Sequence, residues 1–429
     1  MKWGAIKPER IESTRVRLDL GMARSTRFFN EISYPGIGGV GFVRQLRWAT
    51  MGLRLAERVN ESPMRLAEAI EALASYLAVS RHATDYEKSP RVRGRRKFAA
   101  DSDDSSFERL SKRANYVSQP IRMGSGAGLI GLGLATGSPA RFNSLELTPD
   151  GIALADLGLM AIYENEDKKV GDWLHTTWIA KRSKLSAPKK IPTAVQRALL
   201  PGPAATDSNE LIPTSDEVGL VKRLILNNVI RSEMSNAIKS WAEKTGTTFD
   251  EGALLKSIPS ETQRQRVSAA ITYQRVRHAA LNVLQATSSR VAGLQQNNQR
   301  LSLHYLPVEI VNEMSKLAEI CAQLLGDMKI ANIEQNEAFR FCLEQSAALP
   351  GNVRLQSLVL RSKDYLTVVG ECVHLGRLNK ADTGFANGME LDESENFMDD
   401  DVVPNTAIPQ RIRVALSLLR DVGSIQGGS

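Results

Sequence analysis

Cysteine, histidine and aromatic residues are scarce in this sequence. Its 429 residues include five histidines, 6% aromatic residues and three cysteines, which are Cys321, Cys342 and Cys372. No two of these cysteines stand in a CxxC spacing. The sequence therefore argues against a disulfide scaffold or a zinc ribbon, and it is typical of a protein of the reducing cytoplasm.

Long apolar runs are also missing. No stretch of 18 apolar residues occurs, so we expect no membrane span. The first twenty residues contain no apolar segment either, and we expect no secretory signal there. The composition, 42% hydrophobic and 24% charged, is that of an ordinary globular protein with room for two or three domains.

Motifs of catalysis are not found. The sequence has no GxxxxGK[ST], HExxH or GxSxG pattern, and its histidines are scattered. Cys372 and His374 form a CxH pair without a second ligand pair. His278 lies on an apolar helical face and fits a packed position. We therefore expect no enzyme, no cofactor and no bound metal.

Two glycine motifs of the form GxGxxG occur, at residues 36–41 and 126–131. Such a motif binds dinucleotides when a buried strand precedes it and a helix follows. Pro35 stands directly before the first motif, and the second runs on into more glycines and Pro139. We expect the glycines instead to let chain segments pack closely.

Charge is unevenly distributed along the chain. Residues 1–200 hold 32 lysines and arginines against 21 aspartates and glutamates, whereas the remainder holds 23 against 27. A basic half joined to a mildly acidic half suggests one part that faces nucleic acid and one that meets protein. The alternative is an uneven but merely solvated surface.

Composition also predicts the domain organisation. We expect a basic N-terminal domain over 1–182, a proline-rich linker over 183–216 and a helical C-terminal domain over 217–429. A second linker-like insert covers 83–104. The acidic segment at about 381–406 has little apolar pattern and is predicted to be disordered.

Most of the chain has helical periodicity. Apolar residues recur at helical spacing over 41–59, 63–80 and 105–117, and beyond the linker over 216–242, 260–296, 307–328, 333–347 and 408–421. The strand-like stretches, 131–136 and 142–147, are short. The sequence thus predicts a mainly α protein with a short β-hairpin in its N-terminal domain and a helical bundle in its C-terminal domain.

The segment LELTPDGIALADL, which begins at Leu145, joins a strand to a helix. Thr148 is a good N-cap, Pro149 suits the first helical position and Asp150 suits the first turn. This segment resembles the LTPxGxxLA sequence that follows the wing in MarR- and PadR-like transcription regulators. The resemblance covers residues 60–165 and implies a winged helix. The insert 83–104 and the glycine-rich run before the first strand depart from that family.

A winged helix contacts DNA with its second helix and with the tip of its hairpin. We predict DNA contacts from the helix over 105–117, from the hairpin tip, from an arginine stripe on the helix over 41–59 and from the basic run 91–97. A solvated helix face is the alternative for each helix. The candidate residues are Arg44, Arg47, Arg54, Arg58, Arg93, Arg95, Arg96, Arg109, Lys112, Arg113 and Arg141.

These patterns lead to a functional hypothesis. We expect a cytoplasmic, non-enzymatic subunit that binds DNA mainly through its backbone, or lies close to DNA, within a multi-protein bacterial assembly. Its partners would be other protein subunits, with an ATPase or nuclease among them, in phage defence or DNA processing. The alternatives are a ligand-responsive, dimeric winged-helix regulator and an adaptor that binds only proteins.

Overall fold

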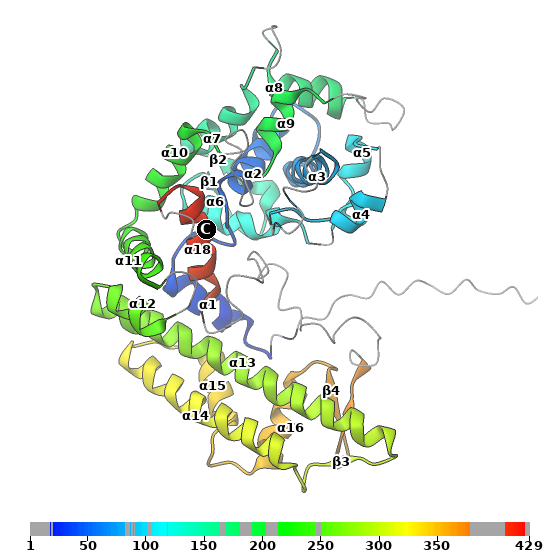
Figure 1. The fold of residues 1–429 in the computed structure, drawn as a ribbon, viewed down its shortest axis with the longest axis vertical. Coiled ribbons are helices and arrows are strands. Elements are labelled where there is room, and N and C mark those ends of the chain that lie inside the picture. The colour runs from blue at the N-terminus through cyan, green and yellow to red at the C-terminus, as the bar shows by residue number, and fades with distance from the viewer. Residues whose placement is uncertain are drawn as a thin grey trace, which may run out of the picture. The chain divides into compact units, whose positions relative to one another are not determined.

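A computed structural model describes most of the chain (Figure 1). The described residues are 18, 20–81, 86, 89, 91–100, 104–117, 119–162, 168–180, 191–202, 213–245, 250–377 and 408–424. The predicted disordered segment at 381–406 lies outside them. Within them the protein is mainly helical, as the periodicity predicts.

The first half of the chain folds into helices joined by short turns. Three 3-10 turns, Arg113–Asn115, Ile121–Gly124 and Phe142–Ser144, and a π-helical stretch, Trp173–Ile179, accompany them. The helices are α1 (Ala23–Ser33), α2 (Val43–Ala56), α3 (Pro63–Arg81), α4 (Arg95–Ala100), α5 (Phe107–Leu110), α6 (Ser125–Gly131), α7 (Pro149–Leu159), α8 (Val170–Asp172) and α9 (Thr193–Leu199).

The second half contains the longest helices, and each predicted helical range there is confirmed as helix. The predicted range 216–242 consists of two helices separated by a short break at 227–228. The helices are α10 (Ser215–Leu226), α11 (Val229–Thr245), α12 (Glu251–Ser257), α13 (Glu261–Gln296), α14 (Val308–Ile330), α15 (Asn336–Glu344), α16 (Gly351–Arg361) and α18 (Gln410–Asp421).

The chain divides into two compact units, and the proline-rich segment is not the boundary between them. The larger unit comprises Ser25–His278, Gln323–Glu334 and Glu393–Ser429, and the smaller comprises Met1–Arg24, Ala279–Ala322 and Gln335–Asp392. The predicted linker over 183–216 lies within the first segment of the larger unit. Its α9 buries Val195 and Leu199 in the interior of the larger unit, and apolar burial holds it there.

Two buried apolar clusters form the core of the larger unit, and α2 belongs to both. Val43, Leu46 and Leu53 pack in one cluster, with side chains from α10, α11 and α18. Trp48 and Met51 pack in the other, with side chains from α3 and α7–α9. Every residue from 43 to 53 is therefore buried, and α2 is a central helix rather than a surface one.

A small hairpin and a cavity complete the larger unit. Strands β1 (Ala135–Thr136) and β2 (Glu146–Leu147) pair antiparallel, with Ala135 opposite Leu147. The predicted strands 131–136 and 142–147 are thus too long, because the first begins inside α6 and the second begins in a 3-10 turn.

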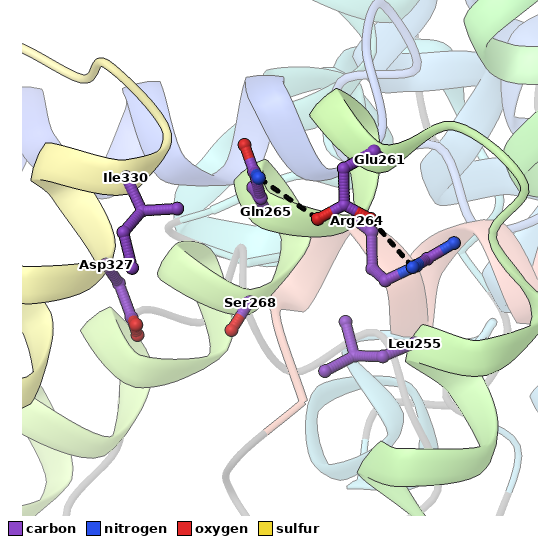
Figure 2. A pocket seen from close by; sticks show the side chains of 7 residues that line it. All are labelled: Leu255, Glu261, Arg264, Gln265, Ser268, Asp327 and Ile330. Atoms are coloured by element: carbon purple, nitrogen blue, oxygen red, sulfur yellow. Dashed lines mark hydrogen bonds and ion pairs between the residues drawn. The ribbon is translucent and has the colours of Figure 1, made fainter.

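A cavity of about 240 Å³ lies between α12, α13 and α14 (Figure 2).

The smaller unit combines helices with a three-stranded sheet. Its strands β3 (Leu301–Ser302), β4 (Leu366–Val369) and β5 (Cys372–Leu375) are ordered β3-β5-β4, all antiparallel. Gly370, with a φ of +62°, sits in the tight turn between β4 and β5, where glycine is favoured. The Arg361 guanidinium binds the Glu344 carboxylate at 2.6 Å and the Leu20 carbonyl at 2.9 Å, which ties α15, α16 and the start of the chain together.

Candidate nucleic-acid interface

The strand-to-helix joint at Thr148 has the predicted chemistry. The Thr148 hydroxyl accepts a hydrogen bond from the Gly151 N–H at 3.2 Å and donates one to the Gly133 carbonyl at 2.7 Å. A Cβ atom added at Gly151 would lie 2.0 Å from the Leu134 carbonyl oxygen. Only glycine therefore fits there, so the cap and the glycine together fix the hairpin against the start of α7.

The helix predicted over 105–117 is wrong. The chain forms only the four-residue α5, then extends at Lys112 and makes a single 3-10 turn. Phe107 and Tyr116 are both buried in the same cluster. Nine residues apart, they would lie on opposite faces of one continuous α-helix, so burying both requires a break. The Tyr116 hydroxyl fixes this arrangement by donating to buried Glu71 at 2.8 Å.

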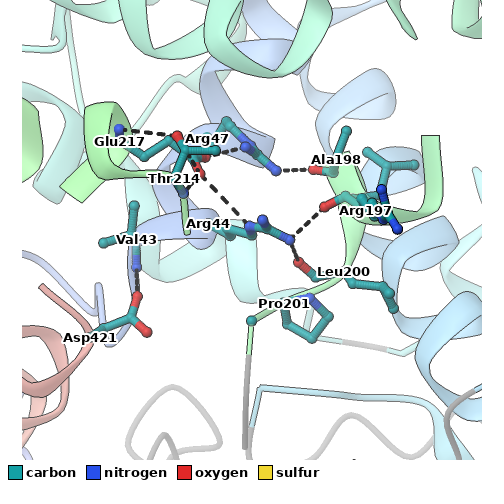
Figure 3. Close-up of polar contacts among 12 residues, drawn as sticks. Val43, Arg44, Arg47, Arg197, Ala198, Leu200, Pro201, Thr214, Glu217 and Asp421 are labelled. Atoms are coloured by element: carbon teal, nitrogen blue, oxygen red, sulfur yellow. Dashed lines mark hydrogen bonds and ion pairs between the residues drawn. The ribbon is translucent and has the colours of Figure 1, made fainter. Parts of the chain in front are cut away.

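Arg44 and Arg47, predicted to be exposed on α2, are buried, and this part of the prediction is wrong. Their side chains are only 4% and 2% exposed, against 0% for Glu217 between them. Arg47 donates to Glu217 and to the Ala198 carbonyl, and Arg44 donates to the Arg197 carbonyl at 2.7 Å (Figure 3). The carbonyls at the end of α9 thus attract the charges that would have faced solvent.

Glu217 is held in place by its own helix terminus. Its carboxylate accepts a hydrogen bond from the Thr214 N–H at 2.7 Å, and the Thr214 hydroxyl caps the Glu217 N–H, forming a capping box at the start of α10. Burial lowers the pKa of Arg47 to about 9, and the charge of Arg44 lowers it too, while Glu217 opposes both effects. Arg47 therefore stays cationic at neutral pH and serves as a structural group.

Asp421 links α18 both to α2 and to Arg91. The Asp421 carboxylate accepts from the Val43 N–H at 2.7 Å (Figure 3), and its other oxygen pairs with Arg91 at 2.7 Å. The Arg91 guanidinium also lies over the Phe42 ring, 5.3 Å from its centre. Part of the basic run 91–97 thus joins the N-terminal and C-terminal segments of the chain.

Four more predicted DNA contacts are half-buried and bonded within the protein. Arg93 and Arg95 donate to the carbonyls of Gln119 and Ser89. The other two are Arg54, which pairs with Glu57 and lies 3.7 Å from Asp156, and Arg109, which donates to the Asp104 carbonyl at 2.8 Å. The Arg96 side chain lies outside the described residues.

The remaining predicted contacts, Arg58, Lys112, Arg113 and Arg141, are exposed, and they lie in segments that adjoin the first turn of α3. Arg58 lies in the α2–α3 turn, five residues before Pro63. Arg113 contacts the Met64 sulfur at 3.8 Å. The Met64 N–H donates to the Asn143 side chain at 2.9 Å, and Asn143 is two residues from Arg141. We call these four residues the α3-end surface.

Two carboxylates pair with cations of this surface, the buried Glu68 and the exposed Glu108. Glu68 is bound by both Arg113 and Arg122, the latter within hydrogen-bond range at 3.1 Å. Glu108 is shared by Lys112 at 2.8 Å and Arg65 at 3.2 Å. A hydrogen bond from Lys112 is the main cause that lowers the pKa of Glu108. The hydrogen bond that Arg113 donates to Glu68 is the main cause that raises the pKa of Arg113. Arg65 and Arg122 thus share the two carboxylates with the cations of the α3-end surface.

The two GxGxxG motifs pack against each other. The Gly39 N–H donates to the Gly124 carbonyl at 2.8 Å, and Cβ atoms added at Gly38 or Gly131 would lie 2.6 Å from the Gly128 nitrogen and 2.1 Å from the Gly36 oxygen. Helix α1, and no strand, precedes the first motif. The glycines thus have the packing role expected from the sequence.

The described part of the chain contains no cluster of three His, Cys, Asp or Glu side chains able to hold a metal. Over those same residues, no helix combines the length and the apolar character needed to cross a membrane. Comparison with protein-family models, curated proteins and solved structures finds no match for this chain.

Proposed function

We propose that this protein is a non-enzymatic adaptor subunit that holds DNA by its phosphates through the α3-end surface. One observation carries the proposal. Four residues predicted to contact DNA, from the α2–α3 turn, the stretch after α5 and the hairpin, are exposed in segments that adjoin the first turn of α3. Exposed cations on neighbouring segments suit a phosphate backbone.

The binding would depend on the backbone rather than on base sequence. A protein that reads the major groove presents a helix of several turns to it. Beside the α3-end surface, α5 has only four residues and α6 is short and largely buried, so neither suits this role. We therefore expect affinity that falls steeply with salt and varies little with sequence.

Protein partners are the second part of the proposal. Large apolar side chains at the surface are candidates for contact with other proteins. The smaller unit exposes several of them: Tyr305, Val308, Val311, Phe339, Leu343, Leu349, Val353, Leu360 and Val369. They support a role within a multi-protein assembly whose ATPase or nuclease is another chain, in phage defence or DNA processing. The free thiols of Cys321 and Cys342 agree with a cytoplasmic setting.

A duplex-DNA gel shift at several salt concentrations tests the DNA contact. The test variant carries Arg58→Ala, Lys112→Ala and Arg141→Ala, and keeps Arg113 because it holds buried Glu68. Each lost phosphate contact lowers the slope of log K against log salt by about 0.9, so three contacts lower it by roughly 3. The control carries Lys222→Ala, Lys244→Ala and Lys256→Ala, three exposed lysines of the same unit. An equal loss in both variants would refute the α3-end surface.

An adaptor that binds only proteins is the second candidate function. Several arginines predicted to contact DNA bond to groups inside the protein instead, above all Arg44 and Arg47, and this favours the protein-only adaptor. A pull-down from the native host separates the two candidates. Recovery of partner subunits without any duplex shift at low salt would select the protein-only adaptor, and recovery together with a salt-sensitive shift would select the DNA-binding one.

A further inference from the structure

The cavity between α12, α13 and α14 has an uncompensated negative charge. Figure 2 shows Glu261, Arg264, Gln265 and Ser268 reaching it from the first two turns of α13. Asp327 comes from the C-terminal part of α14. All of these residues belong to the larger unit.

Arg264 and Glu261 neutralise each other at one side of the cavity. The Arg264 guanidinium donates to the Glu261 carboxylate at 2.7 Å and to the Ile258 carbonyl at 3.0 Å. The other Glu261 oxygen accepts from the Gln265 amide nitrogen at 3.0 Å. This pair therefore has little remaining affinity for a charged ligand.

Asp327 has no such compensation. One of its carboxylate oxygens accepts the Thr272 hydroxyl at 2.6 Å, and within the described residues no cation lies at ion-pair distance from it. The side chain is half-buried, so water screens its charge less than at an open surface. The Ser268 hydroxyl also lines the cavity and can accept a further hydrogen bond, whereas the Gln265 amide oxygen points away from Asp327 (Figure 2).

We propose that this cavity binds a primary alkylammonium group. An ammonium offers N–H donors and one positive charge, which suit the Asp327 carboxylate and the Ser268 hydroxyl. Leu255 and Ile330 also line the cavity and would contact the methylene groups of the ligand. Such a group occurs on free di- and polyamines and at the end of a lysine side chain, and the site recognises the chemistry that they share.

Ligand-observed NMR titration with the intact chain tests this proposal. The probes are n-butylammonium and n-butanol, a neutral molecule of similar size. We expect butylammonium to bind measurably and more tightly than butanol. Asp327→Asn should weaken butylammonium binding by roughly tenfold, the scale of a hydrogen bond to a charged group. Glu319→Gln, which removes a carboxylate from an exposed position earlier on α14, should leave binding unchanged.

A second variant keeps the test valid if Asp327→Asn fails to fold. Ser268→Lys would place a tethered ammonium in the cavity and should abolish butylammonium binding while Asp327 is kept. Equal binding of butanol and butylammonium, or undiminished binding in either cavity variant, would overturn the proposal. Titration with 1,4-diaminobutane and with Nα-acetyl-lysine amide then compares the two sources. Tighter binding of either one supports the site and identifies its natural kind of ligand.

Discussion

Arg47 on α2 and Glu217 on α10 form an ion pair in which both side chains are almost fully buried. Removing one partner of such a pair leaves an uncompensated charge in the interior, which typically costs about 3–5 kcal/mol. We expect Glu217→Ala to lower the free energy of unfolding by that amount in a urea titration. Asp216→Ala, one residue earlier and exposed, should change it by only a few tenths of a kcal/mol. Similar effects of both changes would contradict a structural role for the pair.

Because the two glycine motifs are in contact, we expect the stability of the protein to depend strongly on side-chain size at these glycines. Gly38 has a φ of +56°, and an added Cβ would lie 2.6 Å from the Gly128 nitrogen. Gly38→Ala should therefore destabilise the protein by about 2–4 kcal/mol through backbone strain and overpacking. Gly219→Ala is the matched control, since no atom lies near an added Cβ inside α10. It should be neutral or stabilise the protein by up to about 1 kcal/mol.

His278 predicts a pH dependence of stability. Burial lowers the pKa of this imidazole below its ordinary value of 6.5, so the folded state keeps it neutral where the unfolded chain takes up a proton. The unfolded state therefore binds more protons, and stability falls as the pH drops below 6.5 towards the lowered pKa. His278→Gln should reduce the difference between urea midpoints measured at pH 7.0 and 5.5. A variant that keeps the full difference would rule out His278 as its source.

Arg47 and Arg141 should respond to mutation in opposite ways. Arg141→Ala removes an exposed cation, so we expect it to lower the salt slope of DNA binding by about 0.9 and to leave the urea midpoint unchanged. Arg47→Met leaves Glu217 unpaired in the interior, so it should lower the midpoint and keep the salt slope of the folded protein. Measuring both quantities on both variants separates the two roles. A change of salt slope with Arg47→Met would contradict the assignment of these two roles.

Local patterns predicted those parts of the fold that depend on local interactions. Helices α2 and α3, and those of the second half, follow from apolar periodicity, and the cap at Thr148 follows from its side-chain chemistry. The break at Lys112 was not predicted, because it results from burying both Phe107 and Tyr116 in the interior of the larger unit. Likewise, the prolines around α9 suggest a linker, but burial of Val195 and Leu199 holds α9 in the interior.

The candidate surface was predicted only in part for a related reason. An arginine stripe opposite an apolar arc looks the same in a sequence whether the helix lies at the surface or in the centre. The signal that could have located Arg47 was Glu217 three residues after Thr214, since a capping box places that carboxylate at a helix start. Which arginine it would pair with depends on how α2 and α10 pack.

The sequence by itself determined the mainly helical class, the capped joint at Thr148 and the close-packing role of the glycines, because spacing and side-chain chemistry act over a few residues. Only the tertiary structure decided which cations are structural and which are exposed. Burial depends on segments far apart in the chain: carbonyls of α9 and Glu217 of α10 draw Arg44 and Arg47 inside. The same packing leaves Arg58, Lys112, Arg113 and Arg141 at the surface around the start of α3.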